Sequence, residues 1–186
     1  SIYGTDNSAT LFGMAARGPT ARGVAVIDDK TSESDLDLMG KAGIRGVRLN
    51  LATGGVNDPN VARPRFTNAV ERMKARGWHV QIYTNTPMIT AVKDLIMASP
   101  VPVVFDHIGN PEAELGVRHP GFFALVELAH RGAYVKLSAP YSSCALRYSS
   151  SDRVCLSLSG VRPGSSTTSW EAVKRPLPPR TAPLTT

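Results

Sequence analysis

Five short apolar runs, rich in β-branched residues, alternate with amphipathic stretches along the first 141 residues of this chain. The runs cover residues 23–27, 44–50, 78–83, 101–105 and 134–137, and the amphipathic stretches cover residues 32–39, 64–76, 88–98 and 121–130. Alternating strands and helices predict parallel pairing, because a parallel neighbour is reached only through a long crossover connection. The sequence therefore predicts an α/β fold.

The second amphipathic stretch carries clear helical signals. Pro64 suits the first turn of a helix, where no backbone N–H is needed, and Gly77 suits a left-handed carboxyl-terminal cap. Phe66, Val70 and Met73 fall at i, i+4 and i+7 and form one apolar stripe. We expect this helix to begin at Pro64 and to pack its stripe on the sheet.

The expected strands start near residues 24, 45, 79, 102 and 134, a mean spacing of about 28 residues. Eight such units need roughly 220 residues, which is close to the ~250 residues typical of a (β/α)8 TIM barrel. The first 141 residues supply five units. Two architectures fit this number: an open, doubly wound sheet that is complete in itself, or about five βα units of a (β/α)8 barrel.

Residues 142–186 differ in composition from residues 1–141. They contain 10 Ser, 5 Thr and 5 Pro, with 6 basic and 2 acidic side chains, whereas residues 1–141 contain 15 basic and 13 acidic side chains. Such a segment buries too little apolar surface to offset the entropy that ordering would cost. We expect a folded domain at 1–141 and a disordered tail at 142–186, which carries most of the net charge of +6.

Composition also limits the cellular compartment and the binding partners that we expect for this chain. No run of 18 apolar residues indicates a membrane span, and no basic-then-apolar start indicates a signal peptide. Two cysteines, Cys144 and Cys155, are too few for a disulfide framework, which favours a reducing, cytoplasmic setting. The basic tail has one aromatic residue after Tyr148, namely Trp170, and no groove-reading motif. We expect neither nucleic acid nor a membrane as partner.

Polar residues stand where the expected strands end. In parallel α/β sheets, ligands bind at the carboxyl ends of the strands, because the loops converge there. The second run ends at Arg48 and Asn50, the third at Tyr83, the fourth leads into His107 and the fifth contains Lys136. Neighbouring strands thus offer polar groups to the same edge of the sheet, which predicts a binding site there.

His107 is the strongest candidate for chemistry. It follows an apolar strand and precedes a turn, so its imidazole can bind a metal, shuttle a proton or polarise a carbonyl group. The alternative is a histidine whose hydrogen bonds are satisfied by the neighbouring loop. Asp106 is expected either to orient His107 or to form an Asx turn.

Each of the other candidates has a structural alternative. Arg48 can grip a carboxylate through two parallel N–H bonds, or it can form a salt bridge at the end of the barrel. Tyr83 can donate a hydrogen bond to a substrate or belong to the core. Lys136 can be a binding-site cation or a strand residue whose ammonium reaches solvent. Asn50 ends the same strand as Arg48, and we expect it to bind substrate as well.

Four segments carry a family resemblance. They are GIRGVRLN at 43–50, GWHVQIY at 77–83, PVVFDHIG at 102–109 and YVKLSAPY at 134–141. In this order and spacing they resemble the amidohydrolase-related TIM-barrel hydrolases, and among these the branch that contains 2-pyrone-4,6-dicarboxylate lactonase. In that register the five expected strands correspond to the second through sixth strands of eight.

The resemblance implies hydrolysis of a lactone, amide or related bond of a small carboxylic acid, or in some relatives decarboxylation. His107 corresponds to the histidine of the family's fifth strand, which binds a divalent metal such as Zn or Mn in metal-dependent members. In the lactonase branch, which needs no metal, the same histidine polarises a carbonyl group. Tyr83 and Arg48 match positions that lie near substrate in that branch.

The chain also departs from the family pattern. It starts at Ser1, after the position of the family's first-strand His-x-His pair, and it carries no seventh strand and no late aspartate. Relatives tend to have an arginine where this chain has Ser142. We therefore expect an incomplete barrel whose 142–186 tail is either frameshift-derived or regulatory.

These departures leave the activity of the chain open. The leading hypothesis is a hydrolase of this family, inactive if the missing elements are essential. The alternative is a non-catalytic α/β domain that binds a small carboxylate. An open sheet leaves two edges unpaired, so we also expect a homo-oligomer or poor solubility.

Overall fold

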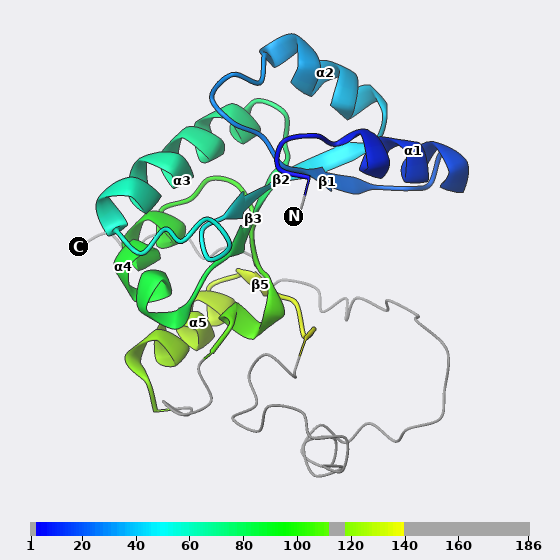
Figure 1. Cartoon of the computed structure of the whole chain (residues 1–186). Helices are drawn as coiled ribbons and strands as arrows, with labels where there is room; N and C mark the ends of the chain where they lie inside the picture. Colours follow the sequence, from blue (N-terminus) through cyan, green and yellow to red (C-terminus); the bar gives the residue numbers. More distant parts are fainter. Residues whose placement is uncertain (1–2, 112–117, 140–186) are drawn as a thin grey trace, which may run out of the picture. The chain divides into compact units, whose positions relative to one another are not determined.

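The computed structural model describes residues 3–111 and 118–139 (Figure 1). These residues lie in the first of the two units into which the chain divides, Ser1–Ser149. The expected tail at 142–186, with both cysteines, lies outside the described residues. None of the helices in the described part of the chain is long and apolar enough to cross a membrane.

Five strands alternate with four α-helices along the described residues, and a further helix, α1, precedes the first strand. The strands are β1 (Gly23–Ala25), β2 (Ile44–Asn50), β3 (His79–Tyr83), β4 (Val103–Phe105) and β5 (Tyr134–Val135). The helices are α1 (Ser8–Arg17), α2 (Glu33–Lys41), α3 (Pro59–Lys74), α4 (Thr86–Met97) and α5 (Pro120–His130), with a single turn η1 (His107–Gly109) after β4.

The strands form one parallel sheet in the order β1-β2-β3-β4-β5. Each strand lies beside the one that precedes it in the chain, whereas a doubly wound sheet reverses its order at a switch point. Right-handed crossovers between successive neighbours place all the connecting helices on one face. In Figure 1, α3, α4 and α5 lie together along one side of the sheet. The strand order is that of a (β/α) barrel, and the doubly wound alternative is wrong.

The pleat gives the two faces of the sheet different characters. The strand residues that face the helices are almost fully buried and apolar: Val47, Val80, Ile82, Val103 and Phe105. Alternate positions project from the opposite face. In the middle of that face stand polar side chains rather than the branched aliphatic residues that usually fill a barrel interior.

The start of α3 differs from the prediction. The Asp58 side chain accepts a hydrogen bond from the Asn60 backbone N–H at 2.8 Å, and Pro59 takes the first helical position. Pro64 therefore lies inside the helix, and the expectation that the helix begins there is wrong. Both prolines fit a first-turn signal, and the Asp58 cap selects the earlier one. The predicted apolar stripe is confirmed, since Phe66, Val70 and Met73 are buried.

Side-chain caps fix where other helices begin and therefore where the strand-end loops lie. Ser32 and Asp35 form a reciprocal capping box at the start of α2. The Asn85 side chain accepts a hydrogen bond from the Met88 N–H at the start of α4, directly after β3. His119 caps α5 in the same way by accepting a hydrogen bond from the Gly121 N–H at 3.0 Å.

Candidate functional site

The strand register brings the predicted residues to one edge of the sheet. Arg48 on β2 stands opposite Gln81 on β3, and Asn50 stands opposite Tyr83. Asp106 directly follows β4, and Lys136 directly follows β5. The carboxyl ends of four adjacent strands thus present a continuous set of polar side chains, which we call the strand-end cluster: Arg48, Asn50, Gln81, Tyr83, Asp106, His107, Lys136 and Ser138.

Asp106 is the centre of this cluster. Only 3% of its side chain is exposed, and its Oδ2 accepts hydrogen bonds from Arg48 Nε at 2.7 Å and from Gln81 Nε2 at 2.9 Å. Its Oδ1 lies 3.1 Å from Lys136 Nζ. Burial raises the pKa of Asp106, but the bonds from Arg48 and Gln81 and the charge of Lys136 outweigh burial, so the pKa lies below its usual range. Asp106 is therefore an ionised carboxylate between two cations.

The guanidinium group of Arg48 is fixed on three sides. Besides the bond from Nε to Asp106, Nη1 donates to the Asn50 side-chain oxygen. The guanidinium carbon lies 4.9 Å from the centre of the Tyr83 ring, over its face, which is a cation–π contact. The salt bridge that we considered as the alternative for Arg48 is present. Within the described part of the chain, Nη2 bonds to no other side chain, so it can still meet a ligand in the fork geometry of arginine.

Gln81 links the two cations, and sequence reasoning did not single it out. It is 5% exposed, donates to Asp106 and accepts from Lys136 Nζ at 2.6 Å. A polar residue within an otherwise apolar buried strand was the available signal, because a buried amide needs partners from neighbouring strands. Lys136 is thus held inside the cluster, with 36% of its side chain exposed.

His107 stands on an unusual turn. His107, Ile108, Gly109 and Asn110 have φ angles of 52°, 58°, 73° and 50°, so four successive residues are left-handed. Each non-glycine residue in this conformation costs about 1–2 kcal/mol, and a β-branched residue such as Ile108 adopts it rarely. Such a turn persists only when surrounding contacts impose it. Here the Ile108 N–H donates to the Lys136 carbonyl at 3.0 Å, which ties the turn to the segment after β5.

The imidazole of His107 has two neighbours in the cluster. Its Nδ1 lies 2.9 Å from Ser138 Oγ, and its ring meets the Tyr83 ring edge-on, with centroids 5.4 Å apart and planes at 86°. The side chain of Asp106 bonds to Arg48, Gln81 and Lys136 rather than to His107. The partner that orients His107 is Ser138, whose place after the fifth run was the available sequence signal.

His79 lies on the same face of the sheet but at the opposite end of β3. Gly46 stands beside it, and a Cβ at Gly46 would come within 2.4 Å of the His79 ring. The absence of a side chain at Gly46 therefore makes room for the imidazole. Burial and the charge of Lys136 lower the pKa of His79. A hydrogen bond with the Arg45 backbone raises it, but the net shift is downward. His79 is a neutral packed residue below the cluster.

A metal site is not built by the described residues. Amidohydrolases are often metal-dependent, but residues 3–111 and 118–139 contain no group of three or more His, Cys, Asp or Glu side chains that could hold a metal ion. Among these residues, His107 contacts a hydroxyl group and an aromatic ring rather than further metal ligands.

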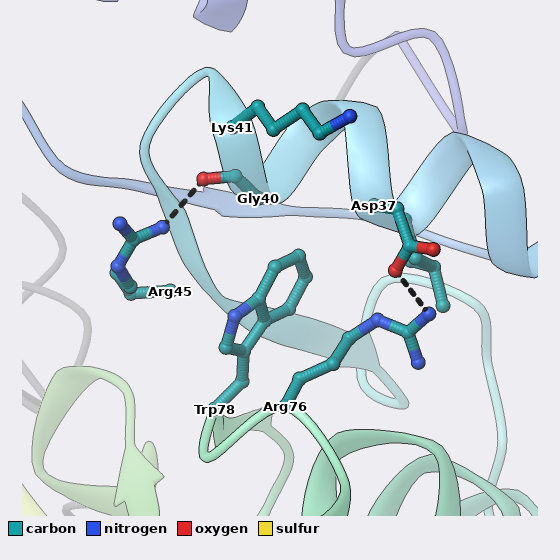
Figure 2. Close-up of a pocket in the computed structure, with 7 residues that line it drawn as sticks. Asp37, Gly40, Lys41, Arg45, Arg76 and Trp78 are labelled. Carbon is teal, nitrogen blue, oxygen red and sulfur yellow. Dashed lines mark hydrogen bonds and ion pairs between the residues drawn. The ribbon is translucent and has the colours of Figure 1, made fainter.

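A second candidate site lies at the amino ends of β2 and β3 (Figure 2). This cavity has a volume of about 590 Å³ and is lined by Leu36, Asp37, Gly40, Lys41, Arg45, Arg76 and Trp78. Arg45 donates to the Gly40 carbonyl, and Arg76 donates to Asp37, each at 2.7 Å. The protein itself thus engages both guanidinium groups. The cavity also lies at the end of the strands away from the strand-end cluster, so we assign the site to the cluster.

Comparison with known proteins gives a family match and related enzymes. The sequence model of the amidohydrolase family matches residues 1–176. A 2-pyrone-4,6-dicarboxylate hydrolase of Comamonas testosteroni is 31% identical over 142 residues, which cover 75% of this chain and 46% of that protein. A D-galactarolactone isomerase of Agrobacterium fabrum is 28% identical over 139 residues, which cover 74% of this chain and 46% of that protein.

A solved structure shows the same relationship. The crystal structure of a probable 2-pyrone-4,6-dicarboxylic acid hydrolase from Acinetobacter baumannii, with citric acid bound, matches with a TM-score of 0.66 and 25% identity. The match covers 75% of this chain and 52% of that one, so the chain spans about half the length of the relatives it matches. The predicted fold class is confirmed, because the five-stranded sheet corresponds to about half of such a TIM barrel.

Proposed function

The chain belongs to the amidohydrolase family, and from this membership we propose that the strand-end cluster binds a small carboxylic acid and polarises a lactone or similar carbonyl bond for hydrolysis. The observation that carries the proposal is the arginine held by Asp106 and Asn50 beside the ring of His107. The related enzymes named above include a dicarboxylate hydrolase and a lactone isomerase. A related crystal structure contains the tricarboxylate citrate.

Arg48 is the proposed carboxylate anchor. Asp106 and Asn50 hold its Nε and Nη1 from the protein side, which leaves Nη2 and the second Nη1 proton for the ligand. A substrate carboxylate can accept two parallel hydrogen bonds there. Since the guanidinium is held before the ligand arrives, little side-chain entropy is lost on binding.

Lys136 and Asn50 are proposed to complete the anion site. The ammonium group of Lys136 has three protons, of which Asp106 and Gln81 engage two. The third is free to meet a second carboxylate of the substrate. Asn50 uses its oxygen to hold Arg48, so its amide N–H groups can donate to the same ligand. Two cations against one carboxylate leave a positive excess, which matches an acidic substrate.

His107 is the proposed electrophilic group. Its imidazole meets the Tyr83 ring edge-on, and the Arg48 guanidinium lies over that ring, so Tyr83 is a common neighbour of the anchor and the histidine. A ligand carboxylate on Arg48 therefore places its carbonyl bond within reach of the ring. A proton of the imidazole hydrogen-bonds the carbonyl oxygen and stabilises the negative charge that develops when water attacks. We propose Tyr83 as a third substrate contact, through its hydroxyl group.

Binding without turnover is the second candidate function. The observation that favours it is Asp106, since three donors engage this carboxylate and hold it ionised. In that state it forms ion pairs with Arg48 and Lys136 rather than activating a water molecule. The strand-end cluster would then be the pocket of a small-carboxylate-binding domain.

The test compares binding with hydrolysis. Citrate binding is measured by calorimetry and opening of 2-pyrone-4,6-dicarboxylate by absorbance, for the full chain and for Arg48→Ala and His107→Ala. We expect Arg48→Ala to weaken citrate binding about tenfold or more. We expect His107→Ala to leave citrate binding in place and to lower hydrolysis by a factor of about 10²–10³. Arg131→Ala and His130→Ala, exposed on or next to α5, are the matched controls.

The outcomes separate the two functions. Citrate binding that depends on Arg48, with no hydrolysis, supports the binding domain. Citrate binding and hydrolysis unchanged in both variants remove the cluster as the site.

We further infer that the chain forms a homo-oligomer. Within the described residues, β1 and β5 each pair on one side only. Unpaired edges of a parallel sheet favour pairing with another chain. Light scattering that gives the mass of a single chain at all concentrations would contradict this inference.

A further inference from the structure

His107 reaches the strand-end cluster from a backbone that leaves it little freedom. Its left-handed turn is fixed at both ends by main-chain bonds, from Gly109 N–H to the Asp106 carbonyl at 2.9 Å and from Asn110 N–H to the His107 carbonyl at 2.7 Å. The bond from Ile108 N–H to the Lys136 carbonyl joins the turn to the segment that carries Ser138. The backbones of His107 and Ser138 are thus held relative to each other.

The ring itself has one specific hydrogen-bond partner among residues 3–111 and 118–139. Nδ1 lies 2.9 Å from Ser138 Oγ, while the edge-on contact with Tyr83 restrains the ring plane. The side chains of His107 and Ser138 are half-buried, which leaves part of the imidazole ring open to a ligand. With Nδ1 occupied, Nε2 is the nitrogen left to meet a substrate.

We propose that Ser138 is a positioning residue that donates its hydroxyl proton to Nδ1 and so holds neutral His107 with its proton on Nε2. A neutral imidazole has one donor and one acceptor nitrogen, and the bond made by one nitrogen decides the role of the other. A hydroxyl group can either donate or accept, and it is free to rotate. The proton on Nε2 is the arrangement that a ring needs to donate to a carbonyl oxygen.

The direction of this bond rests on the proposed function, because the Ser138 hydroxyl can donate to Nδ1 or accept from it. The hydrogen bond and the tautomer are properties of the folded chain and can be measured without any substrate. A histidine without the Ser138 bond would exchange between its two tautomers and would turn about its side-chain bonds. Part of the population would then present an unprotonated nitrogen to the carbonyl oxygen.

The test is nitrogen-15 NMR of the full chain at a pH where the imidazoles are neutral, with His107 signals assigned by their loss in His107→Gln. We expect a protonated Nε2 and an unprotonated Nδ1 in the unaltered chain. We expect both signals of His107 to move towards the values of exchanging tautomers in Ser138→Ala and to return in Ser138→Thr, which keeps the hydroxyl group. His130, exposed on α5, serves as the internal control in each spectrum.

Three results would overturn the proposal: a proton on Nδ1 in the unaltered chain, signals of His107 that do not change in Ser138→Ala, or no return in a folded Ser138→Thr variant. A second readout separates this proposal from the proposed function. Where hydrolysis is measurable, Ser138→Ala should lower kcat about 10- to 100-fold, by analogy with the loss of a partner that orients a metal-binding histidine, with KM little changed. A chain without hydrolysis contradicts the enzymatic function, and the tautomer measurement still decides the role of Ser138.

Discussion

Arg48 Nε and Asp106 Oδ2 lie 2.7 Å apart although their residues are 58 positions apart in the chain. The bond reaches from β2 across β3 to the end of β4. Gln81 on β3 lies between them and bonds to the same carboxylate oxygen. The pair is therefore both a tie between strands and the support of the proposed carboxylate anchor, so its loss should change stability and ligand binding together.

Asp106→Ala should lower the free energy of unfolding by about 3 kcal/mol, at the lower end of the range for breaking a buried ion pair because Lys136 is partly exposed. The variant leaves the cations Arg48 and Lys136 without their carboxylate. Asp106→Asn keeps an acceptor of similar size and should cost less, about 1–2 kcal/mol. Urea unfolding measures both, with Glu71→Ala, an exposed carboxylate on α3, expected within about 0.5 kcal/mol of the unaltered chain. An Asp106→Ala variant as stable as the Glu71→Ala control would contradict this reading.

Lowering the pH should lower the free energy of unfolding, partly because Asp106 becomes protonated. The pKa of Asp106 is lower in the folded chain than in the unfolded chain. At pH values between these two pKa values, the unfolded chain therefore binds a proton at Asp106 more readily than the folded chain does. The stability that ionised Asp106 contributes is complete at pH values above the ordinary pKa of aspartate, and it is lost as the pH falls through the pKa of Asp106 in the folded chain. The difference in stability between the unaltered chain and Asp106→Asn should therefore shrink on acidification from about pH 7 to about pH 3. A difference that stays constant or grows over this range would show that Asp106 is not held ionised.

The Arg63–Asp94 pair should be visible by titration. Arg63 Nη1 and Nη2 lie 2.7 and 2.6 Å from the two carboxylate oxygens of Asp94, and this bidentate bond lowers the pKa of Asp94 to about 2. Arg63→Ala should return that pKa to the ordinary aspartate range, measured by carbon-13 NMR of the carboxyl group. Arg65→Ala removes an exposed arginine from the same helix and should leave it unchanged. An Asp94 pKa that is equal in the two variants would exclude the pair in solution.

The fold was predictable from the sequence where periodicity and composition agree. Five apolar runs that alternate with amphipathic stretches predicted the five strands, and the structure adds the consecutive strand order that excludes a doubly wound sheet. The helix α1 was not predicted: it is only ten residues long, contains Gly13, has no side-chain hydrogen bond at its cap and buries only Met14. The start of α3 was misplaced because two prolines carry the same local signal.

The candidate site was predictable as a set of strand-end residues but not as a network. Position along a strand indicates which edge a side chain reaches, and this found Arg48, Asn50, His107 and Lys136. It does not indicate which residues bond across strands, because those bonds depend on register. The role of Asp106 as the partner of two cations, the link through Gln81 and the bond from His107 to Ser138 are tertiary contacts of that kind.

Gly109→Ala should damage both the fold and the presentation of His107. Gly109 has a φ of +73°, and a Cβ there would lie 2.8 Å from Ile89 Cδ1 and 3.0 Å from Leu125 Cδ2. The left-handed conformation costs alanine about 1–2 kcal/mol, and crowding in a packed core adds about 1–3 kcal/mol. We therefore expect a loss of about 2–5 kcal/mol in urea unfolding, together with a shift of the His107 ring signals, since the turn that carries His107 must move. Gly13→Ala in α1 is the matched control, because nothing lies within 4 Å of its added Cβ, and it should stabilise the helix by up to about 1 kcal/mol. If Gly109→Ala were as stable as the unaltered chain with unchanged His107 signals, the left-handed turn would not be what fixes His107 beside Ser138 and Tyr83.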